Sequence, residues 1–258
     1  MSDQQLLLER QARRHALAKV EERIKQTPNM HIEPSDLKAA GIRHFPLSLE
    51  GAKDRPSFFR PYEEELPLPV EEDEFLQIEL TPDNIMWDTR ALELFLFDHF
   101  HDCRGSAKRE YPPNPPYGVY REIGDFKFGQ LLECGKFNWY AVSVTDYPDE
   151  NLPHIKAIVE NDAIGDGRLL RGEIMTITDI MRARLRSNTL RLHIVAPMLV
   201  LSLMGPRHAR VLEADFDGTM LNIRASKLYG FTRKNTDAVQ LLTRYWLGGA
   251  CGQTTMKS

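Results

Sequence analysis

The sequence predicts a mixed fold of the α/β or α+β class, with one central sheet, flanking helices and a C-terminal β-hairpin. Two patterns support this prediction. Apolar residues recur at helical spacing in segments such as 88–101, and at every second position in segments such as 137–145. The chain has 258 residues, which is enough to bury a large core in a single domain.

Four segments have the composition or spacing of helices. Residues 3–26 mix leucine, valine and isoleucine with Glu, Arg and Lys. Residues 88–101 and 172–187 each place apolar side chains on one helical face, and the second segment carries arginine on the other face. Residues 236–248 begin at Thr236, a suitable N-cap, and end at a glycine.

Other segments predict strands. Residues 137–145 alternate in hydropathy, and residues 193–205 form a continuous apolar run. Residues 154–162 fit either a short helix or a strand. Asp217-Gly218 lies between two further apolar segments, and this dipeptide is a strong signal for the tight turn of a hairpin.

The composition divides the chain near residue 82. Residues 1–82 are expected to form a helical arm followed by a linker, because prolines alternate with acidic clusters from residue 46 onward. Residues 83–258 are expected to form the catalytic α/β domain. An alternative also stays open. The protein would then be a non-catalytic interaction protein, and its N-terminal helix and proline-acidic segment would dock a partner.

No apolar run approaches the roughly 20 residues that span a bilayer, and the N-terminus lacks the apolar stretch of a secretory signal. We therefore expect a soluble, cytoplasmic protein without a membrane partner. Cys103, Cys134 and Cys251 are too widely spaced for a disulfide framework or a zinc site. Phosphate-loop, dinucleotide-binding and nucleophile-elbow motifs are absent from the sequence, and we expect neither a metal nor a cofactor.

Charge is distributed unevenly along the chain. Residues 166–258 hold 14 Lys and Arg against 7 Asp and Glu, whereas residues 1–165 hold 19 against 30. The C-terminal part therefore either faces an anion such as nucleic acid or matches the acidic part within the molecule.

An arginine row stands out within the basic part. It consists of Arg182, Arg184 and Arg186 on the predicted helix 172–187, with Arg191 shortly after it. Arginine at this density neutralises phosphates, so the row predicts contact with tRNA or another polyanion. The alternative is a solvated helix face that pairs with the acidic half of the chain.

Three carboxylates follow the strand predicted at 137–145, namely Asp146, Asp149 and Glu150. Such a cluster can bind a metal, relay protons, or hold a guanidinium through charge-assisted hydrogen bonds. The alternative is that aspartate and proline simply form a turn at this point.

A second constellation suggests a metal-dependent nuclease. Glu173 lies on the predicted helix, Glu213 and Asp215 lie on one hairpin strand, and Lys227 follows on the next. In restriction-type nucleases such groups hold the magnesium that activates water. The residue two positions before the lysine is Ala225 here, where those nucleases have an acidic or amide residue.

The stretch from LLRGEIMTITDIMRARL through HIVAPMLVLSLMGPRHARVLEADFDGT to IRASKLYGF resembles a large group of filamentous-fungal proteins, over about residues 137–250. Within this group, the chain is similar to the arginine-containing cyclodipeptide synthases, whose motif is DDxxE. The matching segment is Asp146-Tyr147-Pro148-Asp149-Glu150, so Tyr147 stands in place of the second aspartate of the motif.

This resemblance implies an enzyme that joins arginine and a second amino acid into a cyclic dipeptide from charged tRNAs. The substrates and partners would be tRNAs charged with arginine and with the second amino acid, and no other cofactor is implied. Asp146, Asp149 and Glu150 would be catalytic, binding the arginine side chain or handling protons. Tyr147 and Glu173 would contact the substrate.

Overall fold

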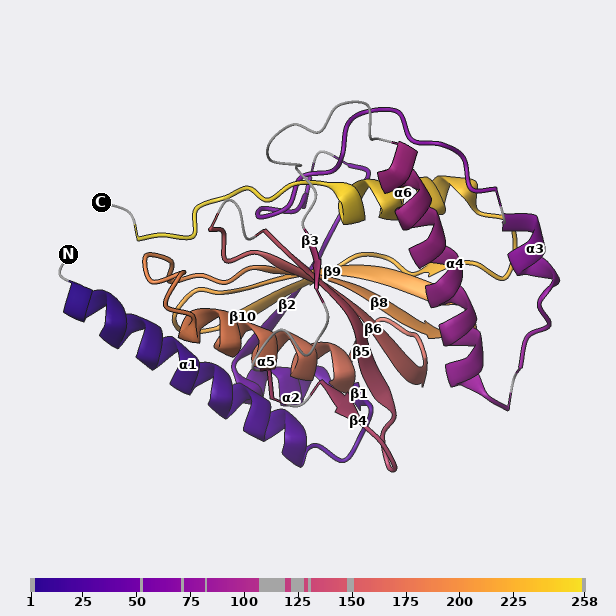
Figure 1. The fold of residues 1–258 in the computed structure, drawn as a ribbon. Coiled ribbons are helices and arrows are strands. Elements are labelled where there is room, and N and C mark those ends of the chain that lie inside the picture. The colour runs from indigo at the N-terminus through magenta and orange to yellow at the C-terminus, as the bar shows by residue number, and fades with distance from the viewer. Residues whose placement is uncertain are drawn as a thin grey trace.

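The computed structural model places a mixed sheet between two layers of helices (Figure 1). It describes residues 3–51, 53–70, 72–81, 83–106, 119–121, 128–129, 131–147 and 151–256. The helices of the described part are α1 (Asp3–Gln26), α2 (Pro34–Ala40), α3 (Glu72–Gln77), α4 (Ile85–Ser106), α5 (Arg171–Arg186) and α6 (Thr236–Leu247). This architecture confirms the mixed fold class with a central sheet and flanking helices.

The main sheet has nine strands within the described residues, in the order β2-β10-β9-β8-β6-β5-β3, with β11 beside β9 and β4 beside β5. Its strands are β2 (Ile42–Pro46), β3 (Val119–Arg121), β4 (Leu132–Glu133), β5 (Trp139–Asp146), β6 (Ile155–Ile164), β8 (Met198–Gly205), β9 (His208–Phe216), β10 (Leu221–Ala225) and β11 (Tyr229–Gly230). β1 (His31–Ile32) and β7 (Leu169–Leu170) form a separate two-stranded sheet. Most neighbours are antiparallel, but β6 runs parallel to β8 and β2 runs parallel to β10.

The four predicted helical segments are helices in the structure, and the segment 154–162, which fitted a helix or a strand, is strand β6. The N-cap of α6 is Asn235 rather than Thr236, because the Asn235 side chain accepts a hydrogen bond from the Ala238 backbone N–H at 3.3 Å. The Thr236 hydroxyl instead donates to Glu72 of α3 at 2.7 Å. The cap therefore lies one residue earlier than expected.

The hairpin predicted at Asp217-Gly218 joins β9 to β10. Asp217 Oδ1 accepts hydrogen bonds from the backbone N–H groups of Thr219 and Met220, at 2.8 and 2.9 Å. Gly218 has a φ of 109°, in the region that favours glycine. The local signal in the sequence was sufficient here because these hydrogen bonds and the glycine conformation involve only residues of the turn itself.

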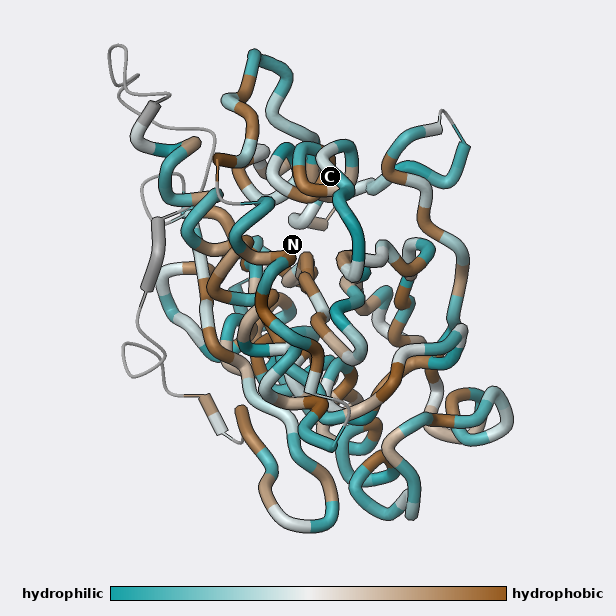
Figure 2. The backbone as a smooth tube through the Cα atoms, turned by 90° about the vertical axis from the view of Figure 1, so that its right-hand side faces the viewer, coloured by the Kyte–Doolittle hydropathy of each residue, from teal (hydrophilic) through white to brown (hydrophobic). Residues whose placement is uncertain are grey.

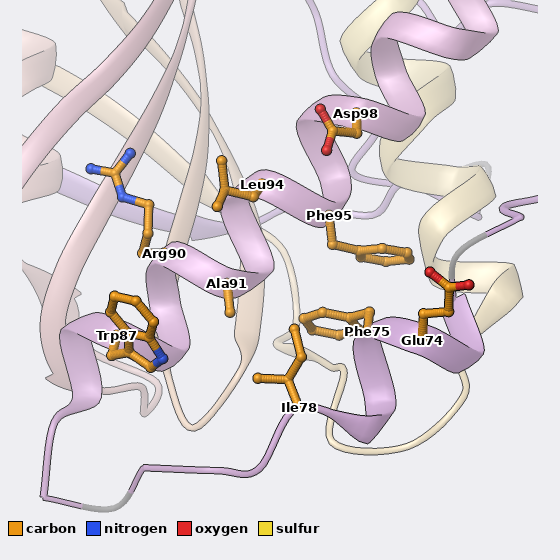
Figure 3. Close-up of a pocket in the computed structure, with 9 residues that line it drawn as sticks. All are labelled: Glu74, Phe75, Ile78, Trp87, Arg90, Ala91, Leu94, Phe95 and Asp98. Carbon is orange, nitrogen blue, oxygen red and sulfur yellow. The ribbon is translucent and has the colours of Figure 1, made fainter.

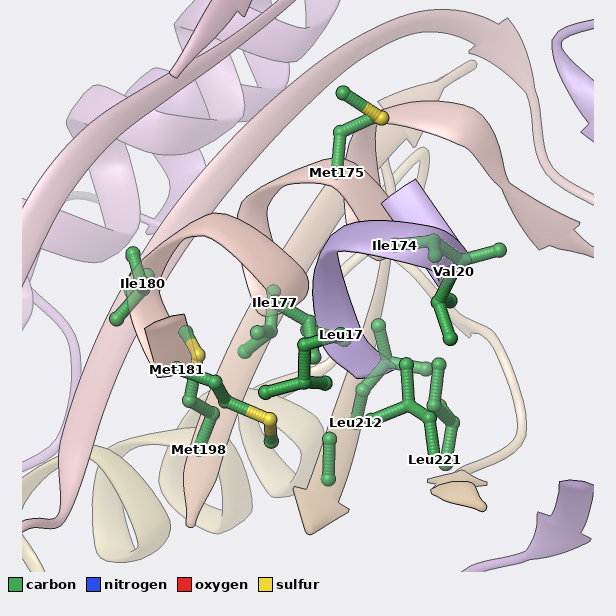
Figure 4. Close-up of a cluster of buried hydrophobic side chains, with 14 of the residues drawn as sticks. Leu17, Val20, Ile174, Met175, Ile177, Ile180, Met181, Met198, Leu212 and Leu221 are labelled. Atoms are coloured by element: carbon green, nitrogen blue, oxygen red, sulfur yellow. The ribbon is translucent and has the colours of Figure 1, made fainter. Parts of the chain in front are cut away.

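Two apolar cores lie on opposite faces of the sheet. The first packs the sheet against α1 and α5, and Figure 4 shows Leu17 and Val20 of α1 meeting Ile174 and Ile177 of α5 above the strands. The second packs the other face against α4 and α6. Strands β8 and β9 are buried along almost their whole length, as expected for a sheet that is covered on both faces.

Helix α5 connects the parallel strands β6 and β8 and lies between the sheet and α1 (Figure 1). A parallel pair needs a crossover of this kind, because the chain must return to the same end of the sheet. Since α1 covers the face of α5 that points away from the sheet, almost all of α5 is buried. The arginine side of α5, which was expected to face solvent, is covered only in part. Arg184 is buried against Leu152 and Pro153, Arg182 is half-buried beside Glu21 of α1, and Arg186 is exposed.

The segments before residue 82 take part in the same body as the rest of the chain. α1 packs along α5, and β2 adds a parallel edge strand to β10. The proline-acidic segment 46–82 runs mainly without regular structure over the α6 side, as predicted, but it also contains the short helix α3. Both chain ends lie at the same end of the molecule (Figure 1 and Figure 2).

Candidate functional site

The predicted carboxylate cluster begins where β5 ends. Asp146 is the last residue of the strand, Tyr147 follows it, and both side chains are buried. Neighbouring residues of a strand point to opposite faces, so Tyr147 joins the core on the α4 and α6 side while Asp146 meets Arg184 of α5. Asp149 and Glu150, the other predicted catalytic residues, lie outside the described residues.

Asp146 and Arg184 form a buried ion pair, with 3.3 Å between Oδ2 and Nη1. The same guanidinium donates to the carbonyl oxygens of Leu152 at 2.8 Å and Pro153 at 3.3 Å. Arg184 thus ties together both ends of the loop that contains residues 148–150. One predicted catalytic carboxylate and one predicted phosphate contact are thus engaged with each other.

Tyr147, which was predicted to contact substrate, packs inside the core on the α4 and α6 side. Its hydroxyl donates to the carbonyl oxygen of Gly248 at 3.0 Å, and its ring lies 5.6 Å from the ammonium group of Lys156. Lys156 in turn donates to the carbonyl oxygens of Gly248, Tyr245 and Trp246. These hydrogen bonds satisfy carbonyl groups at the C-terminal end of α6 that have no partner within the helix.

Sequence reasoning missed two buried basic residues at the start of β6. Burial lowers the pKa of Lys156 well below its usual range and lowers the pKa of His154 to about 4. A neutral His154 donates from Nε2 to the carbonyl oxygen of Cys251 at 2.7 Å. The only signal in the sequence was a lysine among apolar residues in a strand, and it does not reveal which carbonyl groups will meet it.

Glu173, also predicted to contact substrate, is fully buried and bound by Arg210 of β9. Arg210 Nε donates to Glu173 Oε1 at 2.7 Å and Nη2 donates to Oε2 at 2.6 Å. The backbone N–H of Leu170 adds a further hydrogen bond to Oε2 at 2.7 Å. Both carboxylate oxygens are therefore satisfied within the fold, as a buried charge requires.

The groups of the nuclease hypothesis are not brought together. Glu173 meets Arg210 on the α5 side of the sheet, whereas Glu213 is three residues further along β9 and faces the other side. Asp215 shares that second face and pairs with an arginine of the neighbouring strand at 2.7 Å. Lys227 pairs with a surface carboxylate at 2.8 Å. The sheet thus separates the helix carboxylate from the strand carboxylates.

Two of the four predicted phosphate-binding arginines have carboxylate partners. Arg182 forms an ion pair with Glu21 of α1, and Arg184 pairs with Asp146. Both contacts join segments far apart in the sequence. For these two residues the structure favours the alternative in which basic side chains match acidic ones within the molecule.

Arg186 and Arg191 are different, because both are exposed and both line a pocket of about 440 Å³ between α1 and the turn after α5. The pocket is lined by Asp3, Leu6, Leu7, Arg10 and Arg14 of α1, by Leu185 and Arg186 of α5, and by Ser187, Asn188, Arg191 and Leu192. Within the part of the chain that the structure describes, Arg14, Arg186 and Arg191 have no carboxylate partner within 4.0 Å. We name these three residues and Arg10 the arginine pocket.

Arg10 and Arg14 were not among the predicted site residues. Their segment contains three arginines within five residues, and this is the signal that could have identified them. It was not decisive, because the neighbouring Arg13 is buried and donates to Glu9 and to the carbonyl oxygen of Phe216. Spacing alone does not separate the arginines that pack inward from those that face the pocket.

A second hollow lies between α3 and α4 on the other side of the sheet. It has a volume of about 430 Å³, and Figure 3 shows Trp87, Ala91 and Phe95 of α4 facing Phe75 of α3 and Ile78, which directly follows α3, across it. Three of its nine lining residues come from the proline-acidic segment, which one alternative reading of the sequence assigned to partner docking.

A buried carboxyl group lies beneath α4. Glu160 of β6 is fully buried, and its Oε2 lies 2.9 Å from Nη2 of Arg90. Arg90 also lies 3.6 Å from Glu93, so one guanidinium serves two buried acids. Burial raises the pKa of Glu160 to about 7 and also raises the pKa of Glu93.

Among the described residues, no helix has the length and apolar character needed to cross a membrane. In the same residues, no group of three or more His, Cys, Asp or Glu side chains is arranged to hold a metal ion. No protein-family model, no curated protein and no solved structure matches the chain.

Proposed function

We propose that this protein binds tRNA through the arginine pocket and uses aminoacyl-tRNA to form an arginine-containing cyclic dipeptide. The observation that supports the proposal is the set of guanidinium groups of Arg14, Arg186 and Arg191, which have no carboxylate partner in the described structure. Most other arginines of α1 and α5 are paired within the fold. A cluster of unpaired guanidinium groups at the surface attracts phosphate.

The fold also supports the role of the acidic loop. Arg184 joins Asp146 and Leu152, which lie on either side of the segment 148–150, and it belongs to the helix whose end forms the arginine pocket. In this proposal Asp149 and Glu150 handle protons or bind the arginine side chain of the substrate, and Asp146 positions their loop.

The reaction needs no separate energy source. The amine of one aminoacyl group attacks the ester carbonyl carbon of the other, a C–N bond forms, and the tRNA hydroxyl leaves with a proton. A second attack of the same kind closes the ring and releases the second tRNA. A carboxylate that accepts the ammonium proton and returns it to the leaving hydroxyl would accelerate each step.

The activity test is mass spectrometry of small products after incubation with total tRNA, amino acids, synthetases and ATP. A cyclic dipeptide that contains arginine, and that disappears after ribonuclease treatment, is the expected result. Replacement of Asp149 and Glu150 by Asn and Gln should abolish the product while the thermal midpoint stays within a few degrees. Absence of product with charging confirmed would contradict the synthase proposal.

The binding test uses labelled tRNA and fluorescence anisotropy over a range of salt concentrations. The double variant Arg186→Ala/Arg191→Ala should weaken binding and reduce the slope of log K against log salt by roughly one for each arginine that contacts phosphate. Arg233→Ala is the matched control, because Arg233 is exposed and lies outside the arginine pocket. Equal effects of the control and the double variant would contradict binding at this pocket.

A further inference from the structure

The arginine pocket lies at an unexpected place for an anion, namely the C-terminal end of a helix. The last carbonyl groups of α5 have no partners within the helix and carry partial negative charge, which repels phosphate. Arg10 offsets this negative charge, because its guanidinium donates hydrogen bonds to carbonyl groups at the end of α5. Its Nη2 donates to the carbonyl oxygens of Leu185 at 2.7 Å and Ser187 at 2.8 Å, and its Nη1 donates to those of Leu190 and His193.

Arg10 itself is buried, with 5% of its surface exposed. It therefore covers four carbonyl groups and faces them rather than solvent. Its contacts also fix the turn 187–193 against α1, and this turn carries Arg191, while the end of α5 carries Arg186. Arg10 thus sets both the sign of the local charge and the positions of two pocket guanidinium groups.

The walls of the pocket are apolar as well as basic. Leu7 is 60% exposed and Leu192 is 56% exposed, and both line the pocket beside Arg14 and Arg191. A phosphate on a duplex backbone would leave these leucines in water. A base and a ribose would cover them, and guanidinium planes also stack on unpaired bases.

The volume of the arginine pocket also favours an unpaired nucleotide over a duplex. About 440 Å³ lies in the range of pockets that enclose a small ligand, and is too small for a length of double helix. Asp3 is the one acidic residue among the pocket-lining residues, against four arginines. The ligand that fits this combination is small, carries phosphate, and has one flat or apolar part.

We propose that the arginine pocket holds a single unpaired nucleotide, with its phosphate on Arg14, Arg186 and Arg191, and that Arg10 is the positioning residue of this site. The inference rests on the proposed function and names the unit of the nucleic acid that the pocket recognises. A nucleotide within RNA and a free nucleotide share this chemistry, and the experiment separates them.

The test is isothermal titration calorimetry of the full chain with AMP, and separately with adenosine. We expect AMP to bind at least about tenfold more tightly than adenosine, because charge-assisted hydrogen bonds to phosphate dominate. Arg191→Ala should weaken AMP binding at least about fivefold, and Arg233→Ala should leave it unchanged. Equal binding of AMP and adenosine, or no effect of Arg191→Ala, would overturn the inference.

Arg10 is tested with Arg10→Lys, which keeps the charge but lacks the fork of donors that spans four carbonyl groups. We expect weaker AMP binding together with an unchanged slope of log K against log salt, since Arg10 does not touch the phosphate. A merely structural role would instead leave AMP affinity intact once the variant is shown to be folded. In that case the positioning role is wrong.

Competition distinguishes the proposals from each other. Displacement of AMP by uncharged tRNA supports both the pocket ligand and the proposed function. AMP binding that tRNA does not affect leaves a free mononucleotide as the ligand and contradicts the proposed function alone. Binding of tRNA without binding of AMP overturns the pocket inference and leaves the proposed function standing. Binding to phosphatidylglycerol vesicles without AMP binding overturns the inference in favour of a lipid surface.

Discussion

Buried charges of this protein find their partners across long stretches of chain. Glu173 meets Arg210, Asp146 meets Arg184, and Lys156 meets the carbonyl groups at the end of α6. Removing one partner of such a pair leaves a charge without water or counter-charge, which typically costs 3–5 kcal/mol. These residues hold the fold around the candidate site rather than face a substrate.

Glu160 is a buried acid whose negative charge is only partly compensated by the nearby Arg90. Its pKa of about 7 in the folded protein lies above the value of about 4.3 that an exposed glutamate has. Because the folded state binds the proton more tightly, protonation stabilises it fully below about pH 4, and this stabilisation is lost as pH rises towards 7. Glu160→Gln removes a group whose ionisation opposes folding at neutral pH.

We therefore expect the difference in the free energy of unfolding between Glu160→Gln and the native protein to be larger at pH 8 than at pH 5. The expected increase in favour of the variant is on the order of 1–3 kcal/mol. Denaturant unfolding at the two pH values measures this difference. Asp98→Asn is the matched control, since Asp98 is exposed on α4, the helix that carries Arg90, and should show no such change. Parallel pH profiles for the native protein and Glu160→Gln would show that Glu160 ionises normally.

The sequence could not identify these residues as buried. Asp146 and Arg184 are 38 positions apart, and Glu173 and Arg210 are 37 apart, so their pairing depends on strand order. The spacing of an arginine row in the sequence is the same whether the side chains are buried by other elements or exposed to water. Only Arg186 and Arg191 remain as predicted phosphate contacts, because they lie at and just beyond the C-terminal end of α5, where no carboxylate of the described residues pairs with them.

At the scale of elements, α1 is the helix whose role differs most from the predicted arm. Its buried stripe follows helical spacing through Arg10, Arg13, Leu17, Val20 and Ile24. The first two members are arginines that donate to carbonyl oxygens, so the stripe is only partly apolar. The composition predicted a helical arm. Composition does not show that hydrogen bonds from arginines to carbonyl oxygens replace apolar contacts at the N-terminal end of this helix.

This packing predicts a clear difference between two leucines of α1. Leu17→Ala should lower the free energy of unfolding by about 2–5 kcal/mol, because the side chain is fully buried in the core that α1 shares with α5 and the sheet. Leu8→Ala should change it by about 0.5 kcal/mol or less, since Leu8 is 59% exposed. Denaturant unfolding compares them, and equal small effects would mean that α1 is a detachable arm.

The elements that were predicted well carry their signals locally. The Asp217-Gly218 dipeptide and the apolar spacing of 88–101 are patterns among neighbouring residues, and both segments form the predicted elements. The position of β2 beside β10 had no such signal, because a parallel edge strand depends on where the rest of the sheet lies.

At the scale of the whole molecule, the two cores share one sheet and should unfold together. Trp139 reports on the core of α1 and α5, and Trp246 reports on the core of α4 and α6. Each strand between them contributes side chains to both faces. The chain should therefore behave as one cooperative unit rather than as an arm and a catalytic domain divided at residue 82.

Two single-tryptophan variants test this, each with Trp87 replaced by Phe and with either Trp139 or Trp246 retained. We expect their fluorescence transitions in denaturant to coincide with their own transitions in far-ultraviolet circular dichroism. A Trp139 transition clearly ahead of the circular dichroism, with Trp246 following it, would indicate that the α1 side melts as a separate unit.

The pairing of β2 with β10 also bears on synthesis at the ribosome. Residues 42–46 must wait for residues 221–225, and translation of the intervening chain takes roughly 10–40 seconds at ordinary rates. Until residues 171–186 have been synthesised, Leu17, Val20 and Ile24 have no α5 to cover them. The nascent chain thus carries an uncovered apolar stripe for most of its synthesis, and this stripe is where a chaperone would act on the protein first.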